Sequence, residues 1–161
     1  MARVLLTGMS GTGKSTVLAE LGRRGLRTVD TDDDGWVLAR GGWDAPRMDE
    51  LLARYPEVAV SGTVDNQGQF YDRFDHVVLI SVPDDVIVER VRARTTNPYG
   101  KMPEQLAEIL GYVETVEPLL RARATLELDG RRPILELADV LERLVRECRD
   151  DRDPAAGRRH G

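Results

Sequence analysis

The octapeptide Gly8-Met9-Ser10-Gly11-Thr12-Gly13-Lys14-Ser15 decides the fold of this chain. It matches the Walker A pattern G-x-x-x-x-G-K-[ST], a P-loop whose backbone N–H groups wrap phosphate groups. Residues 3–7 before it form an apolar run, and residues 16–24 after it carry apolar side chains at helical spacing. This order of strand, glycine loop and helix is the context that the motif requires, and the helix N-terminus favours an anion.

The lysine content of the chain supports the same interpretation. Two lysines stand against twenty-one arginines, and one of the two is Lys14. A slim ammonium group can lie along a β/γ-phosphate where the broader guanidinium group of arginine does not substitute. The Ser15 hydroxyl is placed to bind Mg²⁺. The residues that we expect to hold ATP in this loop are Gly8, Gly11, Thr12, Gly13, Lys14, Ser15 and Thr16.

Composition limits the remaining possibilities. The 161 residues fit one domain, and a net charge of -5 disfavours nucleic acid and anionic membranes as partners. A single cysteine, Cys148, excludes a disulfide and a cysteine metal cluster, and two histidines are too few for a metal site. No segment has the length of a membrane span, and the first strand begins without a signal peptide. We therefore expect a cytoplasmic monomer.

Apolar runs and helical patterns alternate along the chain, which predicts an α/β domain with a five-stranded parallel sheet and helices on both faces. The expected strands are 3–7, 26–30, 57–62, 76–82 and 125–129. The expected helices are 14–24, 46–55, 83–95, 103–123 and 133–149. Pro118 should kink or break the fourth of these helices. The domain is expected to cover 1–149, with 150–161 as a disordered tail.

An acidic cluster, Asp30-Thr31-Asp32-Asp33-Asp34, follows the second expected strand. The carboxyl ends of parallel strands face the ligand crevice, so these side chains should face the phosphate loop. Carboxylates there can hold Mg²⁺ or accept a proton from an attacking hydroxyl. We favour such roles for Asp30 and Asp32, which lie nearest the strand, and a solvated turn for the other two aspartates.

The glycine loop, the Asp-Thr-Asp sequence at 30–32 and the inferred strand order resemble the shikimate kinase and gluconate kinase branch of the nucleoside monophosphate kinase superfamily. The resemblance implies a three-layer P-loop kinase fold that transfers a phosphoryl group from ATP to a small polar, hydroxyl-bearing metabolite. By similarity, Asp30 assists Mg²⁺ and Asp32 binds and deprotonates the acceptor hydroxyl. The third strand ends in Val60-Ser61-Gly62 without a Walker B acid, and Ser61-Gly62-Thr63 replaces the Gly-Gly-Gly of shikimate kinases.

The resemblance also implies a short LID at about 95–102. Arg90 and Arg94 lie one helical turn apart before it, and by similarity they close over the transferring phosphoryl group, with Arg94 as a catalytic residue. Lys101 could assist. The alternative is an exposed, arginine-rich helix face. After the fifth strand, Arg132 could stack on the adenine of ATP, or it could simply precede the last helix.

The segment 61–75 is rich in polar residues and leads from the third strand to the fourth. The candidates in it for gripping the acceptor are Asp65, Asn66, Gln67 and Arg73. The alternative is a surface loop that covers aromatic side chains. Trp36 and Trp43, in the loop after the acidic cluster, either line the acceptor pocket or belong to the core.

Two other functions remain open from the sequence. A nucleoside monophosphate kinase would need arginines to hold an acceptor phosphate, and Arg40, Arg47 and Arg54 are available between the second and third strands. A non-catalytic ATP-binding regulator would share the phosphate loop. A GTPase is disfavoured because the chain lacks an Asn-Lys-x-Asp motif.

Overall fold

A computed structural model of the chain describes residues 1–9, 11–33, 35–93 and 101–147. One parallel sheet of five strands forms the centre, in the order β2-β3-β1-β4-β5. The strands are β1 (Arg3–Thr7), β2 (Thr28–Asp30), β3 (Val58–Ser61), β4 (His76–Ser81) and β5 (Leu126–Asp129). The predicted α/β fold and its five strands are confirmed, with strand ends shifted by one or two residues.

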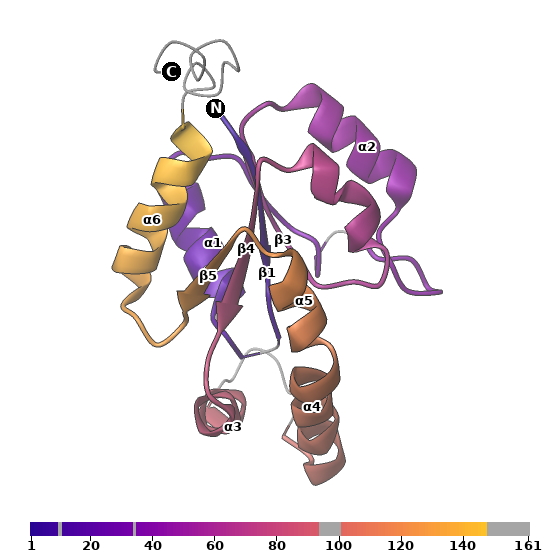
Figure 1. The fold of residues 1–161 in the computed structure, drawn as a ribbon, viewed down its shortest axis with the longest axis vertical. Coiled ribbons are helices and arrows are strands. Elements are labelled where there is room, and N and C mark those ends of the chain that lie inside the picture. Colours follow the sequence, from indigo (N-terminus) through magenta and orange to yellow (C-terminus); the bar gives the residue numbers. More distant parts are fainter. Residues whose placement is uncertain (10, 34, 94–100, 148–161) are drawn as a thin grey trace, which may run out of the picture.

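Helices cover both faces of the sheet (Figure 1). They are α1 (Lys14–Arg23), α2 (Ala45–Arg54), the 3₁₀ helix η1 (Gln67–Arg73), α3 (Asp84–Ala93), α4 (Pro103–Thr115), α5 (Glu117–Arg123) and α6 (Ile134–Arg146). The first face carries α1 and α6, the second carries α2, η1 and α5, and α3 and α4 lie beyond the carboxyl ends of the strands. Within the described residues, no helix is both long enough and apolar enough to cross a bilayer.

The predicted break at Pro118 is confirmed. Helix α4 ends at Thr115 and α5 begins at Glu117, with Pro118 in the first turn of α5. Proline has no N–H to donate and its ring clashes with the preceding turn, so one continuous helix cannot form here. The sequence did not predict η1, because its polar residues and paired aromatics carry no clear helical period.

Both tryptophans belong to the core of the second face. Trp43 is 1% exposed and Trp36 is 8% exposed, and they pack with Met48 and Leu52 of α2. The ring centroid of Trp43 lies 5.7 Å from that of Phe70 in η1. The core alternative for these two residues therefore holds, and their packing fixes the loop that follows the acidic cluster.

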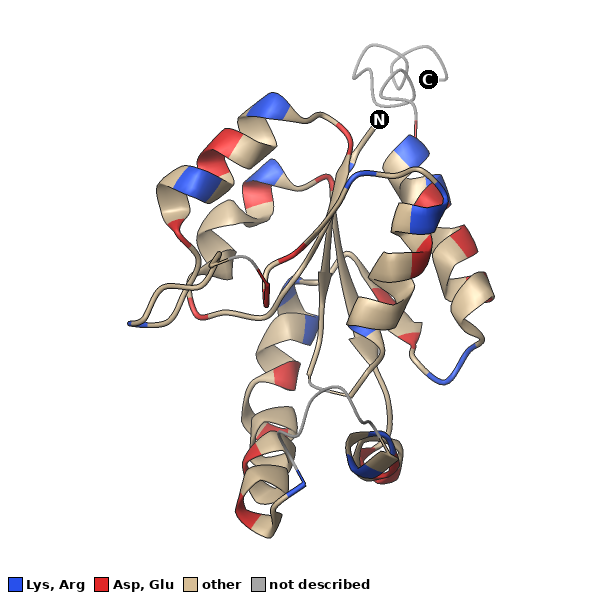
Figure 2. Ribbon diagram, turned by 180° about the vertical axis from the view of Figure 1, so that it is seen from behind, with Lys and Arg blue, Asp and Glu red and all other residues tan. Residues whose placement is uncertain are grey.

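Charged side chains tie the helix after the phosphate loop to the last helix. Acidic and basic residues are interspersed along the helices in the described part of the chain (Figure 2). Arg24, at the end of α1, contacts Asp139 of α6 at 2.7 Å and Glu20 of its own helix at 3.2 Å. Such partly exposed pairs add little stability each, but they fix how α1 lies against α6.

Candidate active site

The P-loop has the backbone that its glycines predict. Gly13 has φ 102° and caps α1, a conformation that L side chains rarely adopt. A Cβ on Gly8 would lie 2.3 Å from the carbonyl oxygen of Ile80, so only glycine allows the loop to approach β4 this closely. Thr12 is buried, and its hydroxyl donates to the Met9 carbonyl at 2.9 Å. These contacts fix the described residues of the loop, Gly8, Met9 and 11–13, against β4 and against one another.

Lys14 is half-buried and lies inside the loop. Its ammonium group donates to the carbonyl of Gly8 and, at 3.0 Å, to that of Met9. Burial lowers the pKa of Lys14 to about 8, although the carboxylates of Asp32 and Asp30 act to raise it. A phosphate group in the loop would give this ammonium a charged partner in place of two carbonyls.

In the Asp-Thr-Asp sequence, the middle side chain is buried and the two aspartates face the phosphate loop. The hydroxyl of Thr31 is buried and donates to the Ser61 carbonyl at 2.8 Å, so the middle residue anchors the turn to β3. On its two sides, Asp30 and Asp32 face the loop. Ser15 donates its hydroxyl to Oδ2 of Asp30 at 3.0 Å, and the backbone N–H of Asp32 donates to Oδ1 at 3.1 Å.

The pair of Ser15 and Asp30 fits Mg²⁺. A hydroxyl and a carboxylate oxygen are hard ligands of the kind that this ion prefers, and they meet beside the loop. Across the described residues, no three His, Cys, Asp or Glu side chains converge as a metal site of their own. Mg²⁺ typically takes one or two protein oxygens and completes its shell with phosphates and water, which suits a two-residue site.

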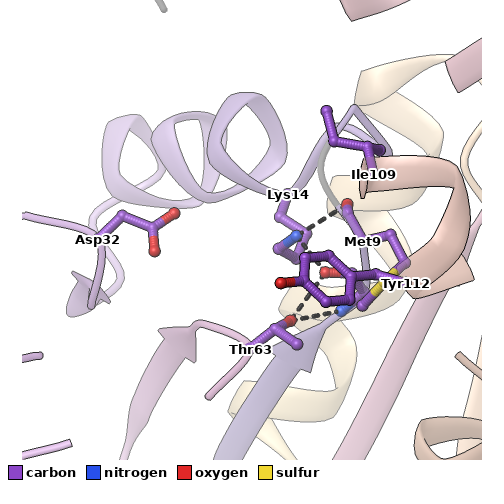
Figure 3. A pocket seen from close by; sticks show the side chains of 7 residues that line it. Met9, Lys14, Asp32, Thr63, Ile109 and Tyr112 are labelled. Carbon is purple, nitrogen blue, oxygen red and sulfur yellow. Dashed lines mark hydrogen bonds between the residues drawn. The ribbon is translucent and has the colours of Figure 1, made fainter. Parts of the chain in front are cut away.

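Asp32 and Lys14 line one cavity of about 230 Å³. Figure 3 shows Lys14 between Asp32 on one side and Met9 and Tyr112 on the other. Loss of water around the Asp32 carboxyl raises its pKa above the ordinary value, the Asp30 charge raises it further, and the Lys14 ammonium lowers it. A carboxylate with a raised pKa accepts protons more readily, as a general base must.

Three residues of this cavity were not predicted from the sequence: Thr63, Ile109 and Tyr112. Thr63 closes the start of the phosphate loop, since its hydroxyl donates to the Gly8 carbonyl at 2.8 Å and accepts from the Gly8 N–H at 3.2 Å. The sequence contains one indication of this role, because Thr63 stands where shikimate kinases have the last glycine of Gly-Gly-Gly. Ile109 and Tyr112 come from α4, where nothing local distinguishes them from other helix residues.

The four residues that the sequence predicted to bind the phosphoryl acceptor lie in different surroundings. Asn66 binds the backbone N–H and carbonyl of Trp43, at 2.8 and 3.0 Å, so its amide holds a loop. Gln67 is buried, and its amide contacts the Val64 N–H, the Thr7 hydroxyl and the Tyr71 hydroxyl. Arg73 pairs with Asp49 of α2 and does not line the cavity that contains Asp32 or the one beside it. Asp65 is exposed at a second cavity, which Gln67 also lines.

Arg90 of α3 joins the phosphate loop to the turn after β5. Its guanidinium donates to the carbonyls of Thr12, at 3.1 Å, and Gly130, at 2.7 Å. Arg132, in the same turn, pairs with Glu136 at 2.9 Å. Arg94 and the LID residues 95–100 lie outside the described residues, and Lys101 is exposed just before α4. Arg90 therefore holds this turn against the phosphate loop. Its contact with ATP and the catalytic role of Arg94 both stay predictions.

The arginines that a nucleoside monophosphate kinase would use lie elsewhere. Arg47 stacks on the Trp36 ring at 3.9 Å, and Arg54 lies 5.4 Å from the Tyr55 ring centroid. Arg40 is exposed in a turn before α2. None of the three lines the cavity that contains Asp32 or the cavity beside it.

The fold and the loop define a P-loop protein with the architecture of small-molecule kinases, and comparisons with known proteins agree. Residues 4–111 match the AAA domain family, and the chain belongs to that family. A dephospho-CoA kinase of Deinococcus radiodurans is 36% identical over 94 residues, which are 57% of this chain. The match spans 43% of that relative, so the chain corresponds to less than half of its length.

Solved structures confirm the fold. A shikimate kinase from Acinetobacter baumannii, in complex with shikimate, superposes with a TM-score of 0.63 over 90% of this chain and 93% of that chain, at 16% identity. A gluconokinase from Sinorhizobium meliloti gives a TM-score of 0.58 over 86% and 87%, at 19% identity. The predicted similarity to the shikimate and gluconate kinase branch is confirmed, and these relatives are all kinases.

Proposed function

We propose that this protein transfers the γ-phosphoryl group of ATP to a hydroxyl group of a small polar metabolite, with Mg²⁺ as cofactor. One observation carries the proposal: the P-loop lysine, Lys14, and the carboxylate of Asp32 line the same cavity. A P-loop alone would suit any nucleotide-binding protein. A basic carboxylate opposite the phosphate site is what phosphoryl transfer to a hydroxyl needs in addition.

Each residue has a defined task in this proposal. Lys14 moves its ammonium from the loop carbonyls to the β- and γ-phosphates and balances their charge as the bond to the leaving oxygen lengthens. Asp32 orients the acceptor hydroxyl and takes its proton. Ser15 and Asp30 hold Mg²⁺, which would neutralise phosphate charge when bound. Arg90 fixes the turn at Gly130 against the loop, beside the expected adenine site.

The names of the relatives give three acceptors, namely dephospho-CoA, shikimate and gluconate. The absence of Gly-Gly-Gly after the third strand disfavours shikimate. The positions of Arg40, Arg47 and Arg54 disfavour a nucleoside monophosphate. A regulator that binds ATP without turnover is the remaining rival, and it makes a different experimental prediction.

The test is the substitution Asp32→Asn, which keeps the shape of the side chain and removes its negative charge. ATP affinity, measured by calorimetry with Mg²⁺, should stay within about twofold, while phosphoryl transfer or residual ATP hydrolysis should fall by roughly 10²-fold or more. Asp33→Asn, one residue further along the exposed turn, is the matched control and should leave turnover unchanged. Equal turnover in Asp32→Asn and wild type would remove Asp32 from the mechanism.

A second measurement separates an enzyme from a regulator. Lys14→Ala should lose ATP binding and keep the fold, because the Lys14 ammonium donates, among the described residues, only to two backbone carbonyls of the loop. Tight, Lys14-dependent ATP binding without hydrolysis and without transfer to any member of a hydroxyl-acceptor panel would favour the regulator. Unchanged ATP affinity in Lys14→Ala would contradict the nucleotide site itself.

A further inference from the structure

A second cavity of about 460 Å³ continues the first one away from Asp32. The two cavities share Met9, Thr63 and Tyr112, so they form one continuous space beside the phosphate loop. The second cavity lies between the segment 63–71 on one side and α4 and α5 on the other. We call it the outer groove. An acceptor whose hydroxyl reaches Asp32 can extend its remaining atoms into this groove.

The walls of the outer groove are mainly apolar. The apolar and aromatic side chains that line it include Val64, Tyr71, Tyr112, Val116, Leu119 and Leu120. Leu119 of α5 is 68% exposed and Tyr112 of α4 is 48% exposed, so both present large apolar side chains at the surface beside the groove. Exposed apolar surface that borders a cleft commonly marks a binding site.

The polar groups of the groove wall are mostly engaged with the protein itself. The Thr63 hydroxyl is bound to Gly8, and the Gln67 amide is bound to backbone and to the Tyr71 hydroxyl. The Tyr112 hydroxyl donates to Glu108 at 3.1 Å. An acceptor that carried hydroxyls on most of its carbons would leave several of them without partners here, and each unpaired buried hydroxyl is costly.

Two charged groups of the groove remain available. Arg123 lies 5.0 Å from the centroid of the Tyr71 ring, and within the described part of the chain no carboxylate forms an ion pair with it. Asp65, on the opposite wall, likewise has no ion pair with a described residue. A guanidinium stacked on an aromatic ring and lacking a counter-ion is a ready partner for a carboxylate, sulfonate or phosphate group.

We infer that the acceptor has an apolar, ring-sized body, with the reacting hydroxyl at one end and an anionic group that binds Arg123 at the other. The inference rests on the proposed function and names the substrate class of the same site. Asp65 is exposed on the groove wall and can accept a hydrogen bond from a second hydroxyl or an amine of the acceptor. Polyhydroxylated sugar acids do not match the groove, because its walls offer them too few partners.

The test uses 8-anilinonaphthalene-1-sulfonate, a fluorescent probe with an aromatic body and one anionic group. The native protein with ATP and Mg²⁺ should bind it at a single saturable site. Tyr112→Ser and Arg123→Gln should each weaken binding by about tenfold, because one removes an apolar wall and the other the counter-ion. The matched controls Leu135→Ser and Arg143→Gln, at exposed positions of α6, should leave the affinity unchanged.

A competition experiment extends the test to acceptors. 4-(Hydroxymethyl)benzoate and gluconate both carry a hydroxyl and a carboxylate at opposite ends, but only 4-(hydroxymethyl)benzoate has an apolar ring between them, so it should displace the probe at the lower concentration. Displacement in the reverse order would overturn the inference, as would probe binding that is absent or insensitive to both groove substitutions. ATP affinity is measured on the same samples. If wild type binds ATP but the probe or the competitors behave against expectation, this inference alone is overturned. If wild type does not bind ATP, the proposed function is overturned.

Discussion

The P-loop lysine should make the empty protein less stable, and replacing it should show this directly. Burial lowers the pKa of Lys14 from 10.5 to about 8, so the folded state holds the proton of this ammonium less tightly than the unfolded state does. Each pKa unit corresponds to about 1.4 kcal/mol, which makes the cost of the charged lysine about 3 kcal/mol near neutral pH. We therefore expect Lys14→Met to raise the stability of the nucleotide-free protein.

The expected gain in stability of Lys14→Met is smaller than the full cost of the buried ammonium charge. Methionine cannot donate to the carbonyls of Gly8 and Met9, and those lost hydrogen bonds offset about half of the relief. A net gain of about 1 to 2 kcal/mol remains, which for a domain of this size raises Tm by roughly 2 to 8 °C. With saturating ATP the order should reverse, because only the wild type gains stability from binding.

The pH dependence gives the decisive check. Between the folded pKa of about 8 and the unfolded value of 10.5, the unfolded chain binds a proton at Lys14 that the folded protein has released. Wild-type stability at this site therefore rises with pH across that window, while the methionine variant has nothing to titrate there. Urea denaturation without nucleotide should show the gap between the two proteins closing from about pH 7 to about pH 10.

The other lysine supplies the control. Lys101 is exposed before α4, so Lys101→Met should leave stability unchanged at both ends of the pH range. A Lys14→Met protein that is less stable than wild type near neutral pH would refute the reasoning. A stability gap that does not change with pH would also refute it, because the effect would then come from packing and not from the ammonium charge.

Three further substitutions test the surroundings of the loop. Thr63→Val keeps the side-chain shape but leaves a loop N–H without its acceptor, so unfolding free energy should fall by about 1 to 3 kcal/mol and ATP affinity should weaken. Gly130→Ala places a Cβ 2.6 Å from the Thr12 carbonyl oxygen and should weaken ATP binding by calorimetry, whereas Gly111→Ala meets nothing within 4 Å and should not. Asp30→Asn should raise the Mg²⁺ concentration needed for half-maximal ATP turnover or binding, and an unchanged requirement would remove Asp30 from the metal site.

The parts of the candidate site whose arrangement the sequence predicts are local. The P-loop forms contacts within itself, as between Lys14 and Gly8 and between Thr12 and Met9, so part of its shape is encoded in consecutive residues. The alternation of Asp30, Thr31 and Asp32 follows from a strand that ends at the crevice, with one side chain in the core and its neighbours facing the loop. The fold could be predicted because the spacing of apolar residues in each segment indicates whether it forms a buried strand or an amphipathic helix.

The parts that the sequence does not predict depend on contacts between distant segments. Thr63 meets Gly8 across 55 residues, and no local pattern specifies which hydroxyl will close the loop. Asn66 and Gln67 were predicted to bind the acceptor because they are polar residues in a loop at the carboxyl end of a strand. Their amides instead satisfy backbone and side-chain groups of the protein, and composition cannot tell a polar side chain that binds the protein from one that awaits a ligand.

The contact between Asn66 and Trp43 has a consequence for recombination among related kinases. One amide side chain takes the N–H and the carbonyl of Trp43 together, as a neighbouring strand would, and so joins two segments that lie 23 residues apart. A chimaera that imports the stretch 62–71 from a relative with no amide side chain at position 66, and keeps the stretch 36–43, would leave both backbone groups of Trp43 without their side-chain partner. Acceptor specificity should therefore transfer between these proteins only when both stretches, 36–43 and 62–71, are exchanged together.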